Sequence, residues 1–234
     1  MISFENVSKR YLRKQAISDL TLTIPEGKIV GLVGTNGSGK STFMKLIAGL
    51  VSPSGGTVLV KGEPASRKIA AKVAYLSELD AFYSFYTVKE TIHFFASQFP
   101  DLNIQKAYEI TEFMEVDLEQ KLKHLSKGNR GRVKIALTLA RDVPVILMDE
   151  PLSGLDPMVR DSIVKGLLSF IDLDKQTVII TTHEVTEIEP LLETVIAIRN
   201  GKVLAMEDVE TIRERDRIRI VEWMKKVYQT AEGV

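Results

Sequence analysis

A glycine-rich run early in the chain has the residue types that cradle the phosphates of a nucleotide. In order, its residues are Gly34, Thr35, Asn36, Gly37, Ser38, Gly39, Lys40 and Ser41. Consecutive backbone N–H groups can point at phosphate oxygens where residues without a Cβ permit a close approach. Lys40 would reach the β- and γ-phosphates, the Ser41 hydroxyl would hold Mg²⁺, and Thr42 could donate to an α-phosphate oxygen. The run therefore predicts a site for a nucleoside triphosphate with Mg²⁺.

Two carboxylates close an apolar run in the second half of the chain. Residues 145–148 are all apolar, and Asp149, Glu150 and Pro151 follow them directly. The carboxyl end of a parallel strand is where α/β sheets place their ligands. Asp149 would complete the Mg²⁺ shell, usually through water, and Glu150 could polarise a water for in-line attack on the γ-phosphate. Two solvated carboxylates at a strand end are the alternative interpretation.

A third motif, residues 125–129, precedes a basic amphipathic helix that we expect to begin near Arg130. Ser126, Gly128 and Asn129 offer a hydroxyl, backbone N–H groups and an amide beside a helix N-terminus, all of which suit an anion. Taken alone, the motif could be an ordinary helix start with Ser126 as its N-cap. The motif lies after the glycine-rich loop and before Asp149. With its motifs in this order, the chain resembles the nucleotide-binding domain of ABC transporters, which favours a functional role over an ordinary helix start.

The resemblance implies that this motif is a variant of the family's LSGGQ-type signature, whose Ser and Gly contact ATP held by the opposite subunit. Ser126 and Gly128 match the pattern, whereas Lys127 stands in place of its first Gly and Asn129 in place of its Gln. These departures keep the groups that bind an anion, and Lys127 adds a positive charge. The resemblance therefore implies a homodimer, or a pair of ATPase subunits, that closes on two ATP molecules.

Four further residues occupy positions that have roles in this family. Tyr11 matches its adenine-stacking aromatic, Asp156 lies in its D-loop at residues 153–156, and His183 matches the switch histidine that contacts the γ-phosphate. Glu78 stands where the family carries a Gln that touches Mg²⁺ and the attacking water. Three of them also have a simpler interpretation: Tyr11 as a surface aromatic, His183 as a structural histidine, and Glu78 as a side chain in solvent.

These motifs need a fold that brings them together. Short apolar stretches bounded by turn residues predict strands, and the βαβ rhythm after residue 145 predicts a parallel sheet. The expected strands are residues 2–7, 20–24, 29–33, 57–60, 73–76, 145–148, 178–181, 195–198 and 203–206. From about residue 80 to 141 helical periodicity replaces them, beginning with a capping box at Thr87 and Glu90. We therefore expect an α/β P-loop NTPase core with a mostly parallel sheet, a small antiparallel β subdomain and an inserted helical subdomain.

The domain boundaries follow from this pattern. We expect the ATPase domain to span residues 1–206, with the helical insertion at about 80–141, and a helical tail to occupy residues 207–234. The loop at residues 82–86 is rich in aromatic side chains, which either pack inside the insertion or anchor a partner. In the resembling family this region faces the membrane subunit.

Composition narrows the choice of partners. Lys plus Arg equals Asp plus Glu at 31 each, so no global field recruits nucleic acid and no nucleic-acid partner is expected. The chain has no Cys, which suits a reducing compartment. Its apolar runs are far shorter than the roughly 20 residues that span a bilayer. We expect a cytoplasmic protein, peripheral on the inner face of the cell membrane through an integral membrane permease subunit.

The resemblance thus implies a subunit that hydrolyses ATP and powers transport through a separate permease, and the signature variant favours an exporter-type system. A soluble ABC-type ATPase outside transport is the alternative, as is a regulatory module that binds ATP without useful hydrolysis. Neutral charge and a single ATPase unit disfavour the first, while Glu150 and His183 disfavour the second.

Overall fold

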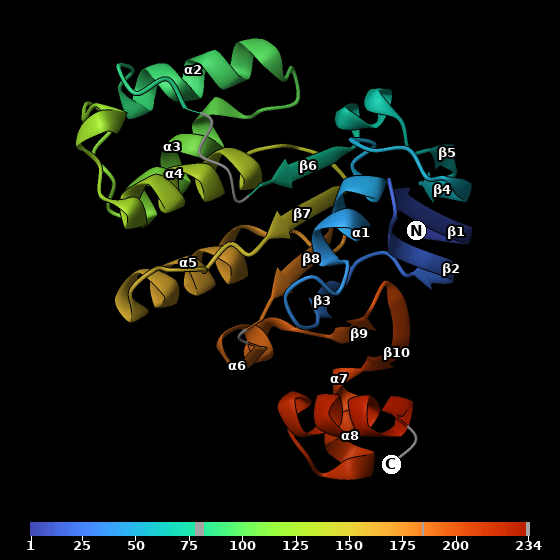
Figure 1. The fold of residues 1–234 in the computed structure, drawn as a ribbon. Helices are drawn as coiled ribbons and strands as arrows, with labels where there is room; N and C mark the ends of the chain where they lie inside the picture. The colour runs from blue at the N-terminus through green and yellow to red at the C-terminus, as the bar shows by residue number, and fades with distance from the viewer. Residues whose placement is uncertain (78–81, 184, 233–234) are drawn as a thin grey trace.

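The computed structural model describes residues 1–77, 82–183 and 185–232 and shows an α/β architecture built on two sheets (Figure 1). The order of the larger sheet is β10 (Lys202–Asp208), β9 (Thr194–Arg199), β3 (Ile29–Val33), β8 (Thr177–Thr182), β7 (Val145–Asp149) and β6 (Val73–Leu76). Its neighbouring strands are parallel except β9 and β10, which form a hairpin. The smaller, antiparallel sheet has the order β2 (Lys14–Ile24), β1 (Ile2–Tyr11), β4 (Gly55–Val60) and β5 (Glu63–Pro64).

Helices and short turns connect and cover these strands. The helices are α1 (Lys40–Ile47), α2 (Val88–Gln98), α3 (Ile104–Phe113), α4 (Lys127–Leu139), α5 (Pro157–Phe170), α6 (Val185–Ile188), α7 (Val209–Thr211) and α8 (Ile220–Glu232). The shorter turns are η1 (Arg67–Ala71), η2 (Leu122–His124) and η3 (Glu189–Leu191), together with the π-helical turn η4 (Ile212–Asp216). In Figure 1, α2, α3 and α4 stand together beyond β6 and β7, whereas α8 lies at the opposite end, below β9 and β10.

The central strands β3, β7 and β8 are buried along their whole length. Such continuous burial requires cover on both faces of the sheet, and the middle residues of the strands are apolar on both faces for that reason. Val30 and Leu32 of β3 join the apolar cluster of α1 and the smaller sheet, which includes Phe43. Ile29 and Val33, on the other face, join the cluster beneath the remaining helices. The edge of the sheet where these strands end is therefore rigidly held between two cores.

The predicted fold class is confirmed. The structure has a mostly parallel sheet, a small antiparallel sheet and a helical insertion between β6 and β7. The capping box at the start of α2 is present, with the Thr87 hydroxyl accepting from the Glu90 N–H at 3.1 Å and the Glu90 carboxylate accepting from the Thr87 N–H at 2.7 Å. Within the described ranges, no helix is long and apolar enough to cross a membrane.

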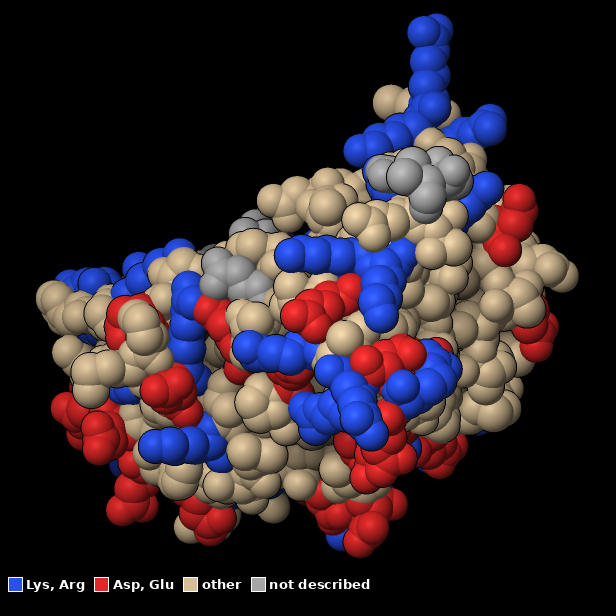
Figure 2. All heavy atoms as spheres, turned by 90° about the horizontal axis from the view of Figure 1, so that it is seen from below, with Lys and Arg blue, Asp and Glu red and all other residues tan. Residues whose placement is uncertain are grey.

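The C-terminal segment packs on the larger sheet and does not extend away from it. Helix α8 contacts α6, β9 and β10, and its Ile220 and Trp223 are 1% and 4% exposed. Figure 2, seen from below, shows Lys and Arg side by side with Asp and Glu across this face of the molecule. In this segment Arg215 pairs with Asp216 at 3.1 Å and with Glu207 at 3.6 Å. Apolar contacts thus hold the tail against the larger sheet, and ion pairs within the tail neutralise part of its charge.

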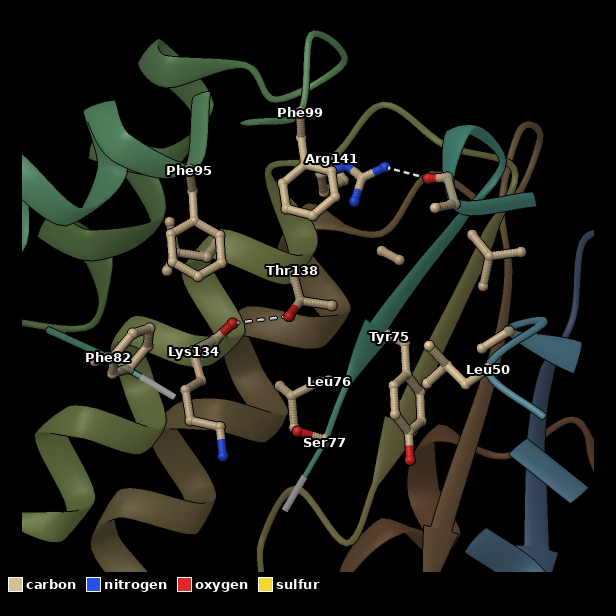
Figure 3. Close-up of a pocket in the computed structure, with 15 residues that line it drawn as sticks. Leu50, Tyr75, Leu76, Ser77, Phe82, Phe95, Phe99, Lys134, Thr138 and Arg141 are labelled. Atoms are coloured by element: carbon tan, nitrogen blue, oxygen red, sulfur yellow. Dashed lines mark hydrogen bonds between the residues drawn. The ribbon is translucent and has the colours of Figure 1, made fainter. Parts of the chain in front are cut away.

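An apolar cavity of about 320 Å³ lies where the helical insertion meets the sheet, between β6, α2 and α4 (Figure 3). Phe82, Phe95 and Phe99 form its aromatic wall. Arg141 closes one end, with its guanidinium 4.1 Å from the centre of the Phe99 ring and an N–H donating to the carbonyl of Ala70 at 2.7 Å. The junction between the sheet and the insertion therefore offers an apolar recess with a charged rim.

Candidate active site

The glycine-rich loop runs from the end of β3 to the start of α1, as the sequence predicts. Gly39 has a φ of +115°, in the region that side chains disfavour, and a Cβ there would lie 2.7 Å from the carbonyl oxygen of Ala16. A Cβ at Gly34 would lie 2.4 Å from the carbonyl oxygen of Ile198. Both glycines are therefore required by the close packing of the loop against neighbouring backbone, which fixes the loop in one conformation.

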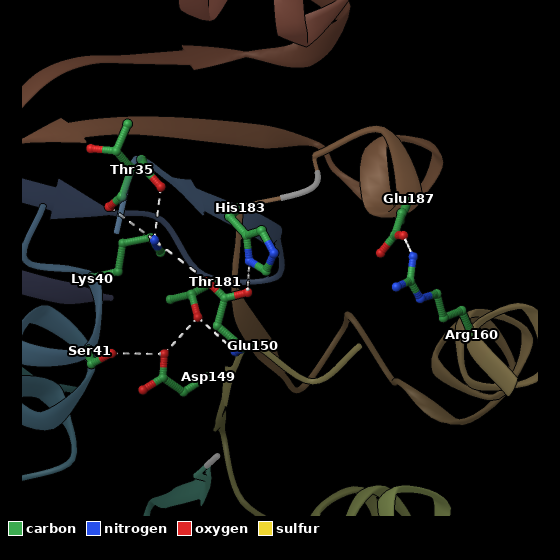
Figure 4. A network of polar contacts seen from close by, with 10 residues as sticks. Thr35, Lys40, Ser41, Asp149, Glu150, Arg160, Thr181, His183 and Glu187 are labelled. Carbon is green, nitrogen blue, oxygen red and sulfur yellow. Dashed lines mark hydrogen bonds and ion pairs between the residues drawn. The ribbon is translucent and has the colours of Figure 1, made fainter. Parts of the chain in front are cut away.

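Lys40 is held inside the loop that precedes it. Its side chain is only 6% exposed, and its ammonium donates to the carbonyl oxygens of Gly34 at 2.8 Å and Thr35 at 3.3 Å. The same ammonium lies 3.5 Å from a carboxylate oxygen of Glu150 (Figure 4). A compact positive charge so placed can interact with phosphate oxygens at the mouth of the loop.

Asp149 is the centre of a hydroxyl network at the carboxyl end of β7. One of its carboxylate oxygens accepts from the Thr181 hydroxyl at 2.7 Å and from the Ser41 hydroxyl at 3.3 Å, and the other accepts from the Tyr75 hydroxyl at 3.1 Å. Thr181 comes from β8 and Tyr75 from β6, the two strands that flank β7. The side chain of Asp149 is thereby fixed in a single orientation, facing the start of α1.

Glu150 leaves β7 with an unusual backbone. Its φ is +50°, which is uncommon for a residue with a side chain and costs energy that the surrounding structure must supply. Its N–H donates to the Thr181 hydroxyl at 2.9 Å, and its carboxylate lies 2.8 Å from Nδ1 of His183. This geometry turns the Glu150 side chain toward Lys40 and His183 (Figure 4). Such strain is typical of positions where a side chain must be aimed for function.

The structure gathers half of the predicted site residues around one cavity of about 410 Å³. Its lining includes Tyr11, Asn36, Gly37, Gly39, Lys40, Ser41, Thr42, Glu150 and His183, together with Lys14, Ala16 and Ser153. Tyr11 is 42% exposed at the end of β1, and the Lys9 ammonium lies 4.9 Å from the centre of its ring. An exposed aromatic face beside a phosphate loop can stack on a base.

The predicted signature residues do not line this cavity. Ser126 is the N-cap of α4, where its hydroxyl accepts from the Asn129 N–H at 3.1 Å. A Cβ at Gly128 would lie 3.0 Å from the Val159 side chain, so this glycine permits α4 to approach α5. Asp156, predicted to be near nucleotide, caps α5 by accepting from the Val159 N–H at 3.1 Å. Within one chain, these residues and the P-loop form two separate groups.

The sequence did not single out two residues that hold the site, Tyr75 and Thr181. Both present a hydroxyl near the end of a buried apolar strand, which is the only local sign of their role. Their contact with Asp149 depends on the strand order, which the local pattern does not reveal. Glu78, predicted to touch Mg²⁺, lies outside the described residues.

The oxygen atoms of Ser41 and Asp149 fit a magnesium ion. Mg²⁺ prefers hard oxygen ligands, keeps several waters and is commonly bound by one or two protein groups together with substrate phosphates. The Ser41 hydroxyl and the Asp149 carboxylate lie 3.3 Å apart beside the phosphate loop. The part of the chain that the structure describes has no cluster of three or more His, Cys, Asp or Glu that could hold a metal by itself. A metal at Ser41 and Asp149 would therefore depend on the nucleotide for further ligands.

A glycine-rich loop between a strand and a helix, with an acidic strand end and a buried lysine beside it, defines a P-loop nucleoside triphosphatase. The family model described as ABC transporter matches residues 17–153. The chain belongs to the ABC transporter family, and it is an ATP-binding and ATP-hydrolysing subunit that powers transport.

Individual relatives agree with this assignment. The chain is 33% identical to the Nod factor export ATP-binding protein I of Burkholderia lata, over 87% of this chain and 69% of that protein. It is 30% identical to the ABC transporter ATP-binding protein NatA of Bacillus subtilis, over 93% of both. An ATP-binding cassette solved as a dimer in a post-hydrolysis state with ADP and Pi has a TM-score of 0.79 and 26% identity, covering 89% of this chain and 98% of that one.

Replacing Lys40 with Ala should weaken ATP binding, because the charge that faces the phosphates is lost. A hydrogen bond to a charged group contributes about 1.5–3 kcal/mol, so Kd should rise roughly 10- to 100-fold in calorimetric titrations. Lys45→Ala is the matched control, since it removes the same charge from the same helix. Equal ATP affinity in the two variants would contradict the role of Lys40.

Proposed function

We propose that two copies of this chain, or this chain and a paired ATPase subunit, face each other head to tail around two ATP molecules. One observation carries the proposal: the cavity beside the P-loop collects Tyr11, Lys40, Glu150 and His183 but not the signature residues. Ser126 instead lies exposed at the N-terminus of α4, where its hydroxyl and the N–H groups of the first helical turn can bind an anion. Each ATP would lie between the P-loop of one subunit and residues 126–129 of the other.

Glu150 is the general base in this proposal. Its carboxylate would accept a proton from a water whose oxygen attacks the γ-phosphorus in line, while the bond from that phosphorus to the bridging oxygen of ADP breaks. The products are ADP and inorganic phosphate. Lys40, 3.5 Å from Glu150, would neutralise charge on the β- and γ-phosphates. Nδ1 of His183, 2.8 Å from the Glu150 carboxylate, supports its orientation, and the imidazole can also bond the γ-phosphate.

Ser41 and Asp149 would hold Mg²⁺ at this site. The ion would supply positive charge that neutralises the phosphate oxygens and orients them for displacement. Thr181 and Tyr75 then act as the groups that aim Asp149, since each donates a hydroxyl to it. The outer partners of a metal ligand commonly matter nearly as much as the ligand itself.

The subunit would drive an integral membrane permease, and we propose that the permease docks on the helical insertion. Support comes from the apolar cavity of Figure 3 and from the exposed aromatic side chains beside it, Tyr83 at 50% and Phe85 at 61% exposed. Exposed aromatic residues bury a large area on binding at low entropic cost. The location is then the inner face of the cell membrane.

We propose that the transporter exports its substrate. The curated relatives include a protein named for Nod factor export. That name favours export over import, and it favours a transporter subunit over an ABC-type ATPase that acts outside transport.

We assign residues 1–206 to the ATPase domain and residues 207–234 to the tail. Asp156, which caps α5, would lie in the D-loop near the second subunit.

Replacing Glu150 with Gln should retain ATP binding but slow hydrolysis about 100-fold or more, because the general base is lost. With ATP bound and unhydrolysed, the variant should elute as a dimer in size-exclusion chromatography. Glu109→Gln, an exposed substitution on α3, is the control and should behave as the parent protein. Unchanged turnover in Glu150→Gln would refute the assignment of the base, and a monomer with ATP bound would refute the dimer.

Replacing Thr181 with Val should raise the Mg²⁺ concentration needed for half-maximal ATPase activity, because Asp149 loses its shortest hydrogen bond. The matched control is Thr177→Val at the other end of β8, which removes a buried hydroxyl that accepts from the N–H of Gly27 at 3.0 Å. Both variants should lose similar stability, about 1–3 kcal/mol. The proposal fails if the Mg²⁺ requirement shifts equally in both or in neither.

Replacing Tyr83 and Phe85 together with Ser should abolish copurification with a multi-span membrane protein identified by mass spectrometry. ATPase activity of the isolated chain should persist, because neither residue lines the P-loop cavity. Phe113→Ser is the control, since Phe113 is an aromatic 44% exposed elsewhere on the insertion. Retention of the membrane protein by the double variant would contradict docking at this surface.

A further inference from the structure

The short segment that follows the switch histidine contains a buried carboxylate. Helix α6 and the turn η3 span residues 185–191, and Glu189 in this segment is 6% exposed. One of its carboxylate oxygens accepts from Nη2 and Nε of Arg219 at 3.0 and 3.3 Å, and the other accepts from the N–H of Ile220 at 3.3 Å. These three donors all come from the C-terminal tail, where Ile220 begins α8.

The same segment is also fixed on its other sides. Val185 and Ile188 are 4% and 0% exposed and pack in the apolar cluster beneath the helices. Glu187 forms an ion pair with Arg160 of α5, the helix that Asp156 caps (Figure 4). The segment is therefore held by apolar contacts to the core, by one ion pair to α5, and by the Glu189 contacts to the tail.

Stability alone does not account for the contacts of Glu189. Glu189 is buried but the Arg219 side chain is 66% exposed, and ion pairs with a solvent-exposed partner typically contribute little to stability. An ion pair does fix the relative position of the two elements that carry it. Here one of those elements begins two residues after His183, whose Nδ1 lies 2.8 Å from the catalytic carboxylate of Glu150. Groups of this kind must be held to within about 0.5 Å of their productive position.

We propose that Glu189 is a positioning residue through which the C-terminal tail sets the position of His183 and thereby the rate of ATP hydrolysis. None of the described tail residues, 207–232, lines the P-loop cavity, so the influence of the tail passes through η3 and α6. Disturbing the Arg219 contact should leave the groups that bind ATP in place and displace the histidine. Binding and turnover should therefore respond differently to a change in the tail.

Arg219→Gln tests this with little risk to folding, because the Arg219 side chain is 66% exposed. Arg215→Gln is the matched control, since Arg215 is 55% exposed on the same tail and pairs with Asp216 and Glu207, not with residues 185–191. In Arg219→Gln we expect kcat to fall about three- to tenfold while KM for ATP changes less than about twofold, because remote misplacement of a catalytic group lowers turnover. Arg219→Lys, which keeps the charge, should recover part of kcat, and Glu189→Gln should repeat the loss.

A spectroscopic readout separates positioning from a loss of stability. The chain has 3 histidines, so the imidazole signals in a ¹H–¹³C spectrum can be assigned with single substitutions. The His183 signal should shift in Arg219→Gln but not in Arg215→Gln, while the signals of His93 and His124 stay in place. Equal kcat in Arg219→Gln and Arg215→Gln, or an unmoved His183 signal, would overturn the proposal. So would a loss of kcat matched by a loss of folded protein in thermal unfolding.

Discussion

The hydroxyl of Thr181 holds together the two acids on which the site depends. It donates to the Asp149 carboxylate at 2.7 Å and accepts from the Glu150 N–H at 2.9 Å. Both bonds exist because β7 and β8 pair in parallel with Asp149 opposite Thr181. A shift of one residue in that register would turn the hydroxyl to the other face of the sheet. Because both strands are buried on both faces, the core fixes their register, and that register in turn places the residues of the site.

The same sheet also supports the strained parts of the site. Glu150 adopts a φ of +50°, and Gly34 and Gly39 accept close approaches of neighbouring backbone that no side chain would allow. Such conformations persist only where the surrounding structure over-determines them. The rigid edge of the sheet between two apolar clusters supplies that support. Function is thus placed on strand ends and their first turns, where geometry is better defined than in long loops.

A single chain brings Lys40, Glu150 and His183 around one cavity, and in the proposed dimer this cavity is half of the binding surface for ATP. The signature residues lie at the start of α4 and do not line the P-loop cavity, which agrees with a second subunit supplying the other half. The proposed role of Glu189 adds a link within the chain, because the element that follows His183 is held by the tail. ATP binding between subunits and hydrolysis within one subunit would then depend on different parts of the molecule.

The sequence by itself determined the chemistry of the site, because its motifs are local. The P-loop needs only consecutive residues, and Asp149 with Glu150 is recognisable from the apolar run before it. The strand and helix pattern also sufficed for the fold class, since apolar periodicity follows burial. Tertiary structure alone decided which groups orient Asp149, because Tyr75 and Thr181 lie 74 and 32 residues from it along the chain. It likewise decided that Arg219 of the tail reaches Glu189, 30 residues away, since side-chain contacts between distant segments depend on how the elements pack.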